Sequence, residues 1–218
     1  METSRVLPGG RLLRYTVAER VVHWVAGISY VYLLLNGLSM WSPSMWWMAA
    51  VLGGGPLTRL THPWVGLIFF VSMMFMYWMW RTDMKITAED KAWNAKIVDY
   101  ITNHDENVPP VGRFNFGQKQ FFWGMFLSII VMLLTGLVMW FPEMLPANLH
   151  ILHLISVLVH PIAALVTIAL FMIHVYMGVV MVRSGFKSIT RGDVSAEWAR
   201  EHHRLWADRV AGNAPGRK

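Results

Sequence analysis

The sequence predicts an all-α fold, a bundle of four transmembrane helices with both termini in the cytoplasm. Of the 218 residues, 55% are hydrophobic and only 15% are charged, whereas about 25% are charged in soluble domains. The charged residues also avoid two long stretches of the chain. Arg59 is the only one in residues 21–80, and Glu143 is the only one in residues 120–182. A bilayer core demands this segregation, because a charge at its centre is costly.

The first two apolar segments each begin at a helix start signal. The first runs over residues 17–40, and Thr16 and Glu19 have the spacing of a capping box at its beginning. The second runs over residues 56–80 and follows the turn sequence GGGP, where Pro56 suits the first turn of a helix.

The other two apolar segments run over residues 118–141, which end near Pro142, and over residues 149–182. Pro161 lies inside the last segment, where it removes a backbone hydrogen bond and is expected to bend the helix. All four segments have the roughly 20 residues that a spanning helix needs, so four transmembrane helices are predicted.

The distribution of Lys and Arg predicts the orientation. Four precede residue 21, six lie in the connection 81–119, and eight lie in residues 183–218. The connections 41–62 and 141–150 contain one and none. The protein is expected in the bacterial inner membrane. Because positive residues gather on the cytoplasmic side, both termini and the middle connection are expected in the cytoplasm.

We therefore predict one integral-membrane domain over residues 1–218, with a cytoplasmic loop at 81–117 and a cytoplasmic tail at 183–218. The N-terminal sequence METSRVLPGGRLLRY has no apolar core of a secretory signal, so a cleaved signal is not expected. The loop is predicted to hold a short amphipathic helix after Thr87, and the tail sequence SAEWAREHHRLWADRV another polar helix. Both helices are candidate docking surfaces for a soluble partner.

Two function classes are disfavoured by composition. The chain has no cysteine, which excludes disulfides, thiolate zinc sites and cysteine-ligated iron–sulfur clusters within it. The net charge of +6 is explained by membrane orientation, so we predict no nucleic-acid partner.

Four of the nine histidines are embedded well inside the predicted spans, and their depths match in pairs, whereas His150 and His153 lie near the start of the last span. His160 and His174 are fourteen residues apart, which is about 21 Å and close to four full turns of helix, so they share one face at two depths. His23 lies at the depth of His174 near the cytoplasmic side, and His62 lies at the depth of His160 on the far side. Because haem iron accepts an axial imidazole on each face, two stacked pairs are typical of a di-haem cytochrome b.

Other features fit this interpretation. Cations near the membrane edges, Arg20 or Arg59, are candidates for binding the haem propionates. Glycines provide room for a porphyrin where helices pack closely: Gly27, Gly37, Gly66, Gly124 and Gly136.

Three other interpretations of the histidines remain open at this stage. They are hydrogen bonds between helices, a proton relay, and a zinc site. A relay normally includes membrane carboxylates, and here only Glu19 and Glu143 lie near the span ends. Zinc is disfavoured because most of the membrane separates the two pairs.

Over about residues 11–209 the sequence resembles the cytochrome b, or gamma, subunit of membrane-bound respiratory formate dehydrogenase. The resemblance rests on these stretches: ERVVHWVAGISYVYLLLNGLS, LTRLTHPWVGLIFFVSMMFMY, VGRFNFGQKQFFWGM, LVH with MIHVYMG, and VSAEWAREHHRLW. Related cytochromes b of hydrogenases and thiosulfate reductases share the histidine pattern more loosely. Pro161, directly after His160, departs from the family pattern.

The resemblance implies two haem b groups and a quinone site, with menaquinone or ubiquinone as the substrate. It implies that His23 and His174 bind the cytoplasmic-side haem, and that His62 and His160 bind the far-side haem. The residues that it places at the quinone are Asn115, Gly117 and Gln118, with His174 adjacent. Asn115 and Gln118 also have the spacing of a simple helix cap, which is compatible with that role.

The resemblance also implies the function of an electron-transfer subunit. Electrons would enter from an iron–sulfur beta subunit and reduce the quinone, which takes protons from the cytoplasm. Formate oxidation would occur on a separate molybdenum- or tungsten-containing alpha subunit, so no catalytic residue for it is expected here. The alternatives are a cytochrome b of a hydrogenase or thiosulfate reductase, a stand-alone di-haem quinol oxidase, and a haem-free membrane anchor or small transporter.

Overall fold

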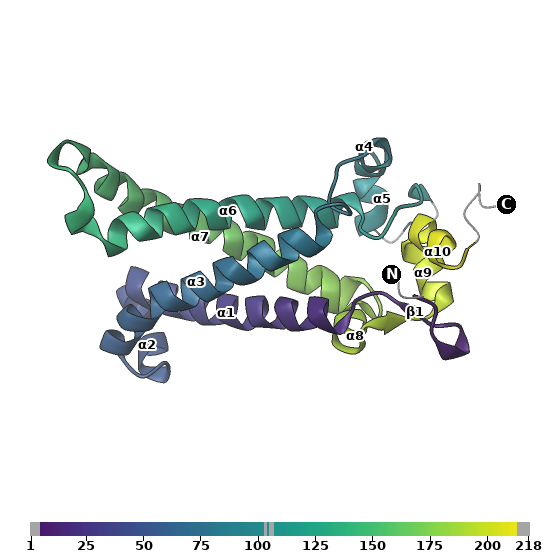
Figure 1. The fold of residues 1–218 in the computed structure, drawn as a ribbon, viewed down its shortest axis with the longest axis horizontal. Coiled ribbons are helices and arrows are strands. Elements are labelled where there is room, and N and C mark those ends of the chain that lie inside the picture. Colours follow the sequence, from purple (N-terminus) through teal and green to yellow (C-terminus); the bar gives the residue numbers. More distant parts are fainter. Residues whose placement is uncertain (1–4, 103, 105–106, 213–218) are drawn as a thin grey trace. The chain divides into compact units, whose positions relative to one another are not determined.

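The computed structural model describes residues 5–102, 104 and 107–212. Parts of the predicted loop (103 and 105–106) and the end of the predicted tail (213–218) lie outside them. Within this part of the chain, four helices are long and apolar enough to cross a membrane. These are α1 (Val17–Trp41), α3 (Gly55–Trp80), α6 (Phe116–Trp140) and α7 (Ile151–Val175), the last continued by the π-helix η6 (Tyr176–Met181) (Figure 1). The predicted all-α fold with four apolar spans is confirmed.

The helix starts follow the capping signals in the sequence. The N–H of Thr16 donates to Oε2 of Glu19 at 2.7 Å, and the N–H of Glu19 donates to Oγ1 of Thr16 at 3.3 Å. This reciprocal pair satisfies backbone donors that the first turn of α1 leaves without helical partners. Pro56 is the second residue of α3, and α7 remains helical through Pro161.

Shorter elements lie between and after the spans. The helices are α2 (Trp47–Val51), α4 (Ala88–Asn94), α5 (Ile97–Ile101), α8 (Gly185–Arg191), α9 (Ala196–His202) and α10 (Arg204–Val210). Short 3-10 helices occupy Pro8–Gly10, Pro43–Met45, Pro142–Met144 and Ala147–Leu149. Two strands, β1 (Leu12–Leu13) and β2 (Asp193–Val194), pair antiparallel within the described chain. They are too short to give a periodic signal in the sequence.

The described chain divides into two compact units. The bundle unit comprises Val21–Trp78 and Gly124–Ile173, and so contains most of α1, α3, α6 and α7. The terminal unit comprises the described residues of 1–20, 79–123 and 174–218.

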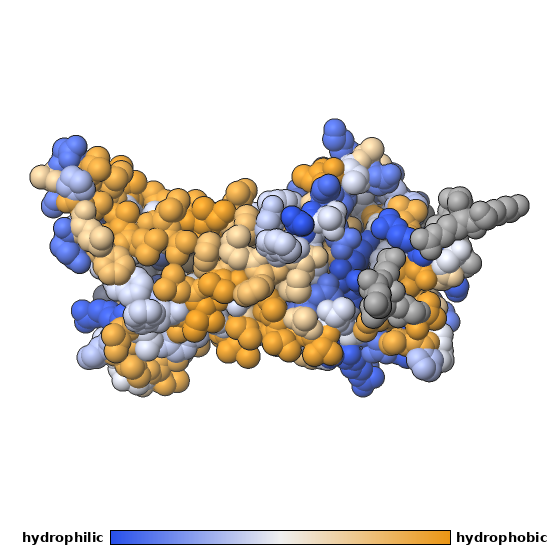
Figure 2. All heavy atoms as spheres, viewed as in Figure 1, coloured by the Kyte–Doolittle hydropathy of each residue, from blue (hydrophilic) through white to orange (hydrophobic). Residues whose placement is uncertain are grey.

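Aromatic and small residues hold the helices of the bundle unit together. The Tyr30 hydroxyl of α1 donates to Oγ1 of Thr167 in α7 at 3.2 Å, and Tyr77 of α3 stacks on Phe126 of α6 at 4.9 Å. Apolar side chains also cover the outside of these helices, as the mostly orange spheres over α1 and α6 show (Figure 2). In water this exposed apolar surface would be unfavourable, whereas in a membrane the lipid tails cover it.

The terminal unit has its own small core. Leu12 of β1 and Val194 of β2 pack with Ala199 of α9 and with Trp206 and Ala207 of α10. The tail was predicted as one polar helix, but it forms two, because His203 between them has non-helical dihedrals (φ −146°, ψ 52°). The apolar side of the tail therefore faces its own unit.

The loop helix agrees with its sequence signal. The helix α4 begins directly after Thr87, and Thr87 and Asp90 form the capping box. Asp90 also pairs with Lys119 of α6 at 2.7 Å, with both side chains buried. The loop is thus fixed to the start of α6.

Candidate functional site

A cavity of about 560 Å³ lies among α1, α3, α6 and α7 inside the bundle unit. Its lining is mostly apolar, and it lies within the range of roughly 300–1,000 Å³ that is usual for ligand and cofactor sites. His62 of α3 and His160 of α7 both line it, with ring centres 6.2 Å apart. The structure therefore brings together the two histidines predicted for the far side.

The separation of the two rings fits a shared metal ion. Two imidazoles that hold one ion between them need ring centres about 6 Å apart, since each metal–nitrogen bond is about 2.0 Å long. Glycines make the surrounding space. A Cβ on Gly136 would lie 3.4 Å from Cε1 of His160, and one on Gly37 would lie 3.7 Å from Cε1 of His62. The residues present thus fit a planar haem b held by two axial imidazoles.

Each histidine ring is also held by a polar side chain from a neighbouring helix. Nδ1 of His62 lies 3.2 Å from Oδ1 of Asn36 in α1. Nδ1 of His160 lies 2.9 Å from Oγ1 of Thr135 in α6. The sequence analysis missed both partners, although a polar residue inside an apolar span is the signal that could have found them.

The two predicted counter-ions differ in their surroundings. Arg59 lines the cavity, where it is available to a propionate of a bound haem. Arg20 belongs to the terminal unit and donates from Nη1 to the carbonyl of Thr190 at 2.6 Å. Arg59 is therefore the better candidate for the far-side haem.

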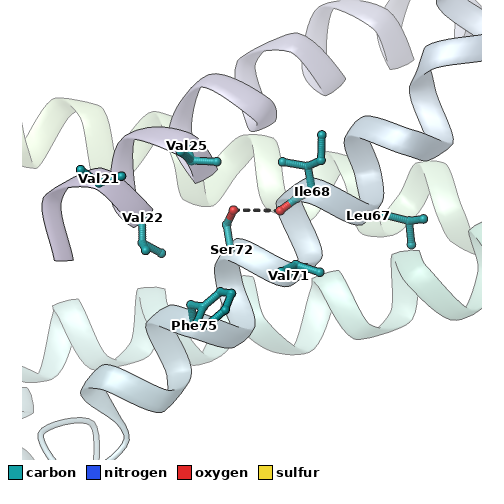
Figure 3. A pocket seen from close by; sticks show the side chains of 8 residues that line it. All are labelled: Val21, Val22, Val25, Leu67, Ile68, Val71, Ser72 and Phe75. Atoms are coloured by element: carbon teal, nitrogen blue, oxygen red, sulfur yellow. Dashed lines mark hydrogen bonds between the residues drawn. The ribbon is translucent and has the colours of Figure 1, made fainter. Parts of the chain in front are cut away.

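A second, shallower hollow lies on the outside of the bundle unit between α1 and α3 (Figure 3). It has a volume of about 440 Å³ and is almost entirely apolar. Its one polar side chain, Ser72, donates to the carbonyl of Ile68 at 2.8 Å. The residues that line this groove include no histidine or other usual ligand of a metal.

We expect Gly66→Leu to prevent haem binding at the cavity. Gly66 lines it, and nothing lies within 4 Å of a Cβ added there, so a leucine would occupy space inside the cavity without a backbone clash. Haem per chain is measured by the pyridine haemochrome assay. The matched control is Ile68→Phe on the same helix, which adds bulk to the outer groove and should retain all haem. Equal haem loss in both variants would contradict this assignment of the cavity.

The other two predicted ligands lie in different units, so their pairing stays a prediction. In the bundle unit, His23 packs edge-on against Trp24 at 5.7 Å. In the terminal unit, His174 stacks on Phe121 of α6 at 4.4 Å and an interplanar angle of 10°. The π-helix η6 begins two residues after His174, and such local changes of helix type are frequent at functional sites.

The residues predicted at the quinone form the start of α6. The N–H of Gln118 donates to Oδ1 of Asn115 at 2.9 Å, and the N–H of Asn115 donates to Oε1 of Gln118 at 3.0 Å. The cap predicted as the alternative role of this pair is therefore present. It leaves the amide NH₂ of Gln118 outside the cap. Gly117 is packed against Trp93, which would lie 3.4 Å from an added Cβ.

A buried charge network fixes the segment before this cap. Arg113 donates to Oε1 of Glu19 at 2.7 Å, to Oδ2 of Asp83 at 2.9 Å and to the carbonyl of Arg14 at 2.7 Å. Burial by itself would lower the pKa of the Arg113 guanidinium, but the charge of Glu19 and the hydrogen bonds to Glu19 and Asp83 together outweigh burial and raise that pKa. Arg113 therefore remains the positive centre of the terminal unit.

Arg14 and His203 connect this network to the tail. Nη2 of Arg14 lies 2.9 Å from Nε2 of His203, and the guanidinium lies over the rings of Trp198 and Trp206 at 5.2 and 5.4 Å. Arginine can only donate, so Nε2 of His203 accepts and its Nδ1–H donates to the carbonyl of Gly112 at 2.9 Å. The bond from Arg14 requires a neutral His203, because a protonated Nε2 could not accept it.

We expect the terminal unit to lose stability as the pH falls below about 6.5, the usual pKa of histidine. Burial, and then the charge of Arg14, lower the pKa of His203 well below that value. Arg113 and His202 add to this repulsion. Between the unfolded and folded pKa values the unfolded chain binds the extra proton, so folding weakens with falling pH. Hydrogen exchange of α9 and α10 measures the effect.

The control for this prediction is His203→Gln, which removes the titrating group. We expect its protection factors, which are exchange rates corrected for the intrinsic pH dependence of amide exchange, to depend less on pH between about 6.5 and 5 than those of the unmodified chain. An unchanged pH dependence would assign the effect to other groups.

The chain is similar to known proteins over most of its length. The sequence model of the family described as prokaryotic cytochrome b561 matches residues 14–192. The cytochrome b556(fdo) subunit of formate dehydrogenase from Escherichia coli is 30% identical over 195 residues, which cover 89% of this chain and 91% of that protein. The nitrate-inducible cytochrome b556(Fdn) subunit from the same species is 30% identical over 197 residues, covering 89% of each. The cytochrome b556 subunit of Haemophilus influenzae formate dehydrogenase is 26% identical over 202 residues, covering 90% of this chain and 82% of that protein.

Proposed function

The chain belongs to the prokaryotic cytochrome b561 family, and on that premise we propose that it is the membrane-anchoring di-haem cytochrome b subunit of a formate dehydrogenase complex. It is an inner-membrane electron-transfer protein that takes haem b, as its family and its four apolar helices indicate. The finer proposal is that it passes electrons from an iron–sulfur subunit to membrane quinone. The domain is proposed to extend over residues 1–218, with both termini in the cytoplasm.

The observation that carries the proposal is the pair His62 and His160 across one cavity. A bound haem b supplies one-electron redox chemistry within the membrane. His62 and His160 would hold that group between α3 and α7. The apolar lining excludes water and thereby sets the local dielectric.

We propose His23 and His174 as the ligands of a second haem b, nearer the cytoplasm. The support is the resemblance of the flanking sequences together with the equal depths that the sequence predicts for these two residues in their spans. The stacking of His174 on Phe121 contributes by restricting its ring orientation.

The proposed quinone residues are Asn115, Gly117 and Gln118, with His174 adjacent. The start of α6 supports this role, because a helix N-terminus presents backbone N–H groups to a carbonyl oxygen. The amide NH₂ of Gln118, outside the cap, is a further donor. Protons for the reduced quinone are proposed to come from the cytoplasm.

The similar proteins are cytochrome subunits of formate dehydrogenases, which supports a complex with other subunits. We propose an iron–sulfur beta subunit as the electron donor and a molybdenum- or tungsten-containing alpha subunit as the site of formate oxidation. No catalytic residue for that oxidation is assigned to this chain.

The proposal is tested by deleting the gene in the source organism and measuring electron transfer to quinone in membranes. We expect formate-dependent quinone reduction to be lost and to return with the unmodified gene. Loss of hydrogen- or thiosulfate-linked transfer instead would assign the chain to a hydrogenase or a thiosulfate reductase. Quinol oxidation by the chain alone would indicate a stand-alone oxidase. A purified chain without haem would overturn the electron-transfer role.

A further inference from the structure

Asn36 is held so that only one of its atoms can face His62. Its side chain is completely buried, and its Nδ2 donates to the carbonyl of Thr58 at 3.0 Å. Oδ1 is therefore the atom that lies 3.2 Å from Nδ1 of His62. An amide oxygen can only accept, so Nδ1 of His62 carries the hydrogen and Nε2 carries the lone pair.

Thr135 defines the tautomer of His160 by the same logic. Its hydroxyl has one hydrogen, which it donates to the carbonyl of Val131 at 2.7 Å. Oγ1 is left with lone pairs only, so it accepts from Nδ1–H of His160 at 2.9 Å. Both histidines thus keep Nε2 as the metal-binding atom.

We propose that Asn36 and Thr135 are positioning residues of the far-side haem, which fix the tautomer of each axial histidine and lower the reduction potential of the haem. The inference rests on the proposed function. An acceptor at Nδ1–H makes the imidazole a stronger donor to the metal, and a stronger donor favours the oxidised iron. Removing either acceptor should therefore raise the potential.

The test is a redox titration of haem absorbance in the complete purified complex with the variants Thr135→Val and Asn36→Leu. Thr135→Val keeps the shape of the side chain and removes the hydroxyl, which is the acceptor for His160 and the donor to the carbonyl of Val131. We expect it to shift the oxidised-to-reduced equilibrium of one haem about tenfold toward the reduced form, which is about 59 mV for one electron. Asn36→Leu should shift the same haem in the same direction, and the second haem should not move.

Thr167→Val is the matched control. Thr167 lines the same cavity and is buried, but its hydroxyl donates to the carbonyl of Ala164 and accepts from Tyr30, not from a histidine. The Thr167→Val variant should leave both potentials unchanged. Thr135→Ser, which keeps the hydroxyl, should have the potentials of the unmodified protein. Haem content measured on the same samples distinguishes failure of the proposed function from failure of this inference. An absence of haem in the unmodified protein would overturn the proposed function. Two haems with unshifted potentials, or an equal shift in Thr167→Val, would overturn this inference alone.

Discussion

His62→Ala should reduce the haem content of the purified chain from two haem b groups to one. The variant removes one of the two imidazoles that would hold the group, and His160 is then the only histidine left among the described residues that line the cavity. Haem is measured by the pyridine haemochrome assay against protein concentration. His153→Ala is the control, because His153 lies seven residues before His160 in α7 and does not line the cavity.

The double variant tests the pairing itself. Since His62 and His160 line one cavity, His62→Ala with His160→Ala should lose no more haem than either single variant, whereas independent sites would give additive losses. By contrast, His62→Ala with His174→Ala should remove both haems. Loss of both haems from the first pair of substitutions would contradict the pairing proposed here.

The sequence was sufficient for the far-side pair because helix periodicity alone fixes face and depth. His62 and His160 lie in predicted spans, and the rise per residue places them at one level. It was not sufficient for Asn36 or Thr135. Their contacts depend on how neighbouring helices are rotated about their axes, and that rotation results from packing in three dimensions.

Local signals were also reliable only for local structure. The capping box of Thr16 and Glu19 is visible in four residues of sequence and is present in the fold. The second role of Glu19, as the partner of Arg113, joins residues 94 positions apart. The same holds for β1 and β2, whose pairing brings Leu12 to Val194. Such long-range pairs have no signature in a single sequence.

Breaking the buried pair of Arg113 and Glu19 should have the largest effect on stability outside the cavity. Arg113→Met leaves the Glu19 carboxylate buried without its cation, which costs about 3–5 kcal/mol when a buried pair loses one partner. We expect faster hydrogen exchange in residues 107–118, because Arg113 also holds Asp83 and the carbonyl of Arg14.

The control for Arg113→Met is Lys96→Met in the same loop. Lys96 forms a pair with Asp99 at 3.3 Å, but its side chain is half exposed, so its loss should cost about 0–1 kcal/mol. Adding Glu19→Gln to Arg113→Met should recover part of the loss, since a neutral amide costs less to bury than a lone carboxylate. Equal exchange rates in the Arg113 and Lys96 variants would contradict a central role for the pair.

If the pair does hold this segment, Arg113→Met should also weaken quinone reduction while haem content is retained, because Asn115 follows Arg113 by two residues and begins the cap of α6.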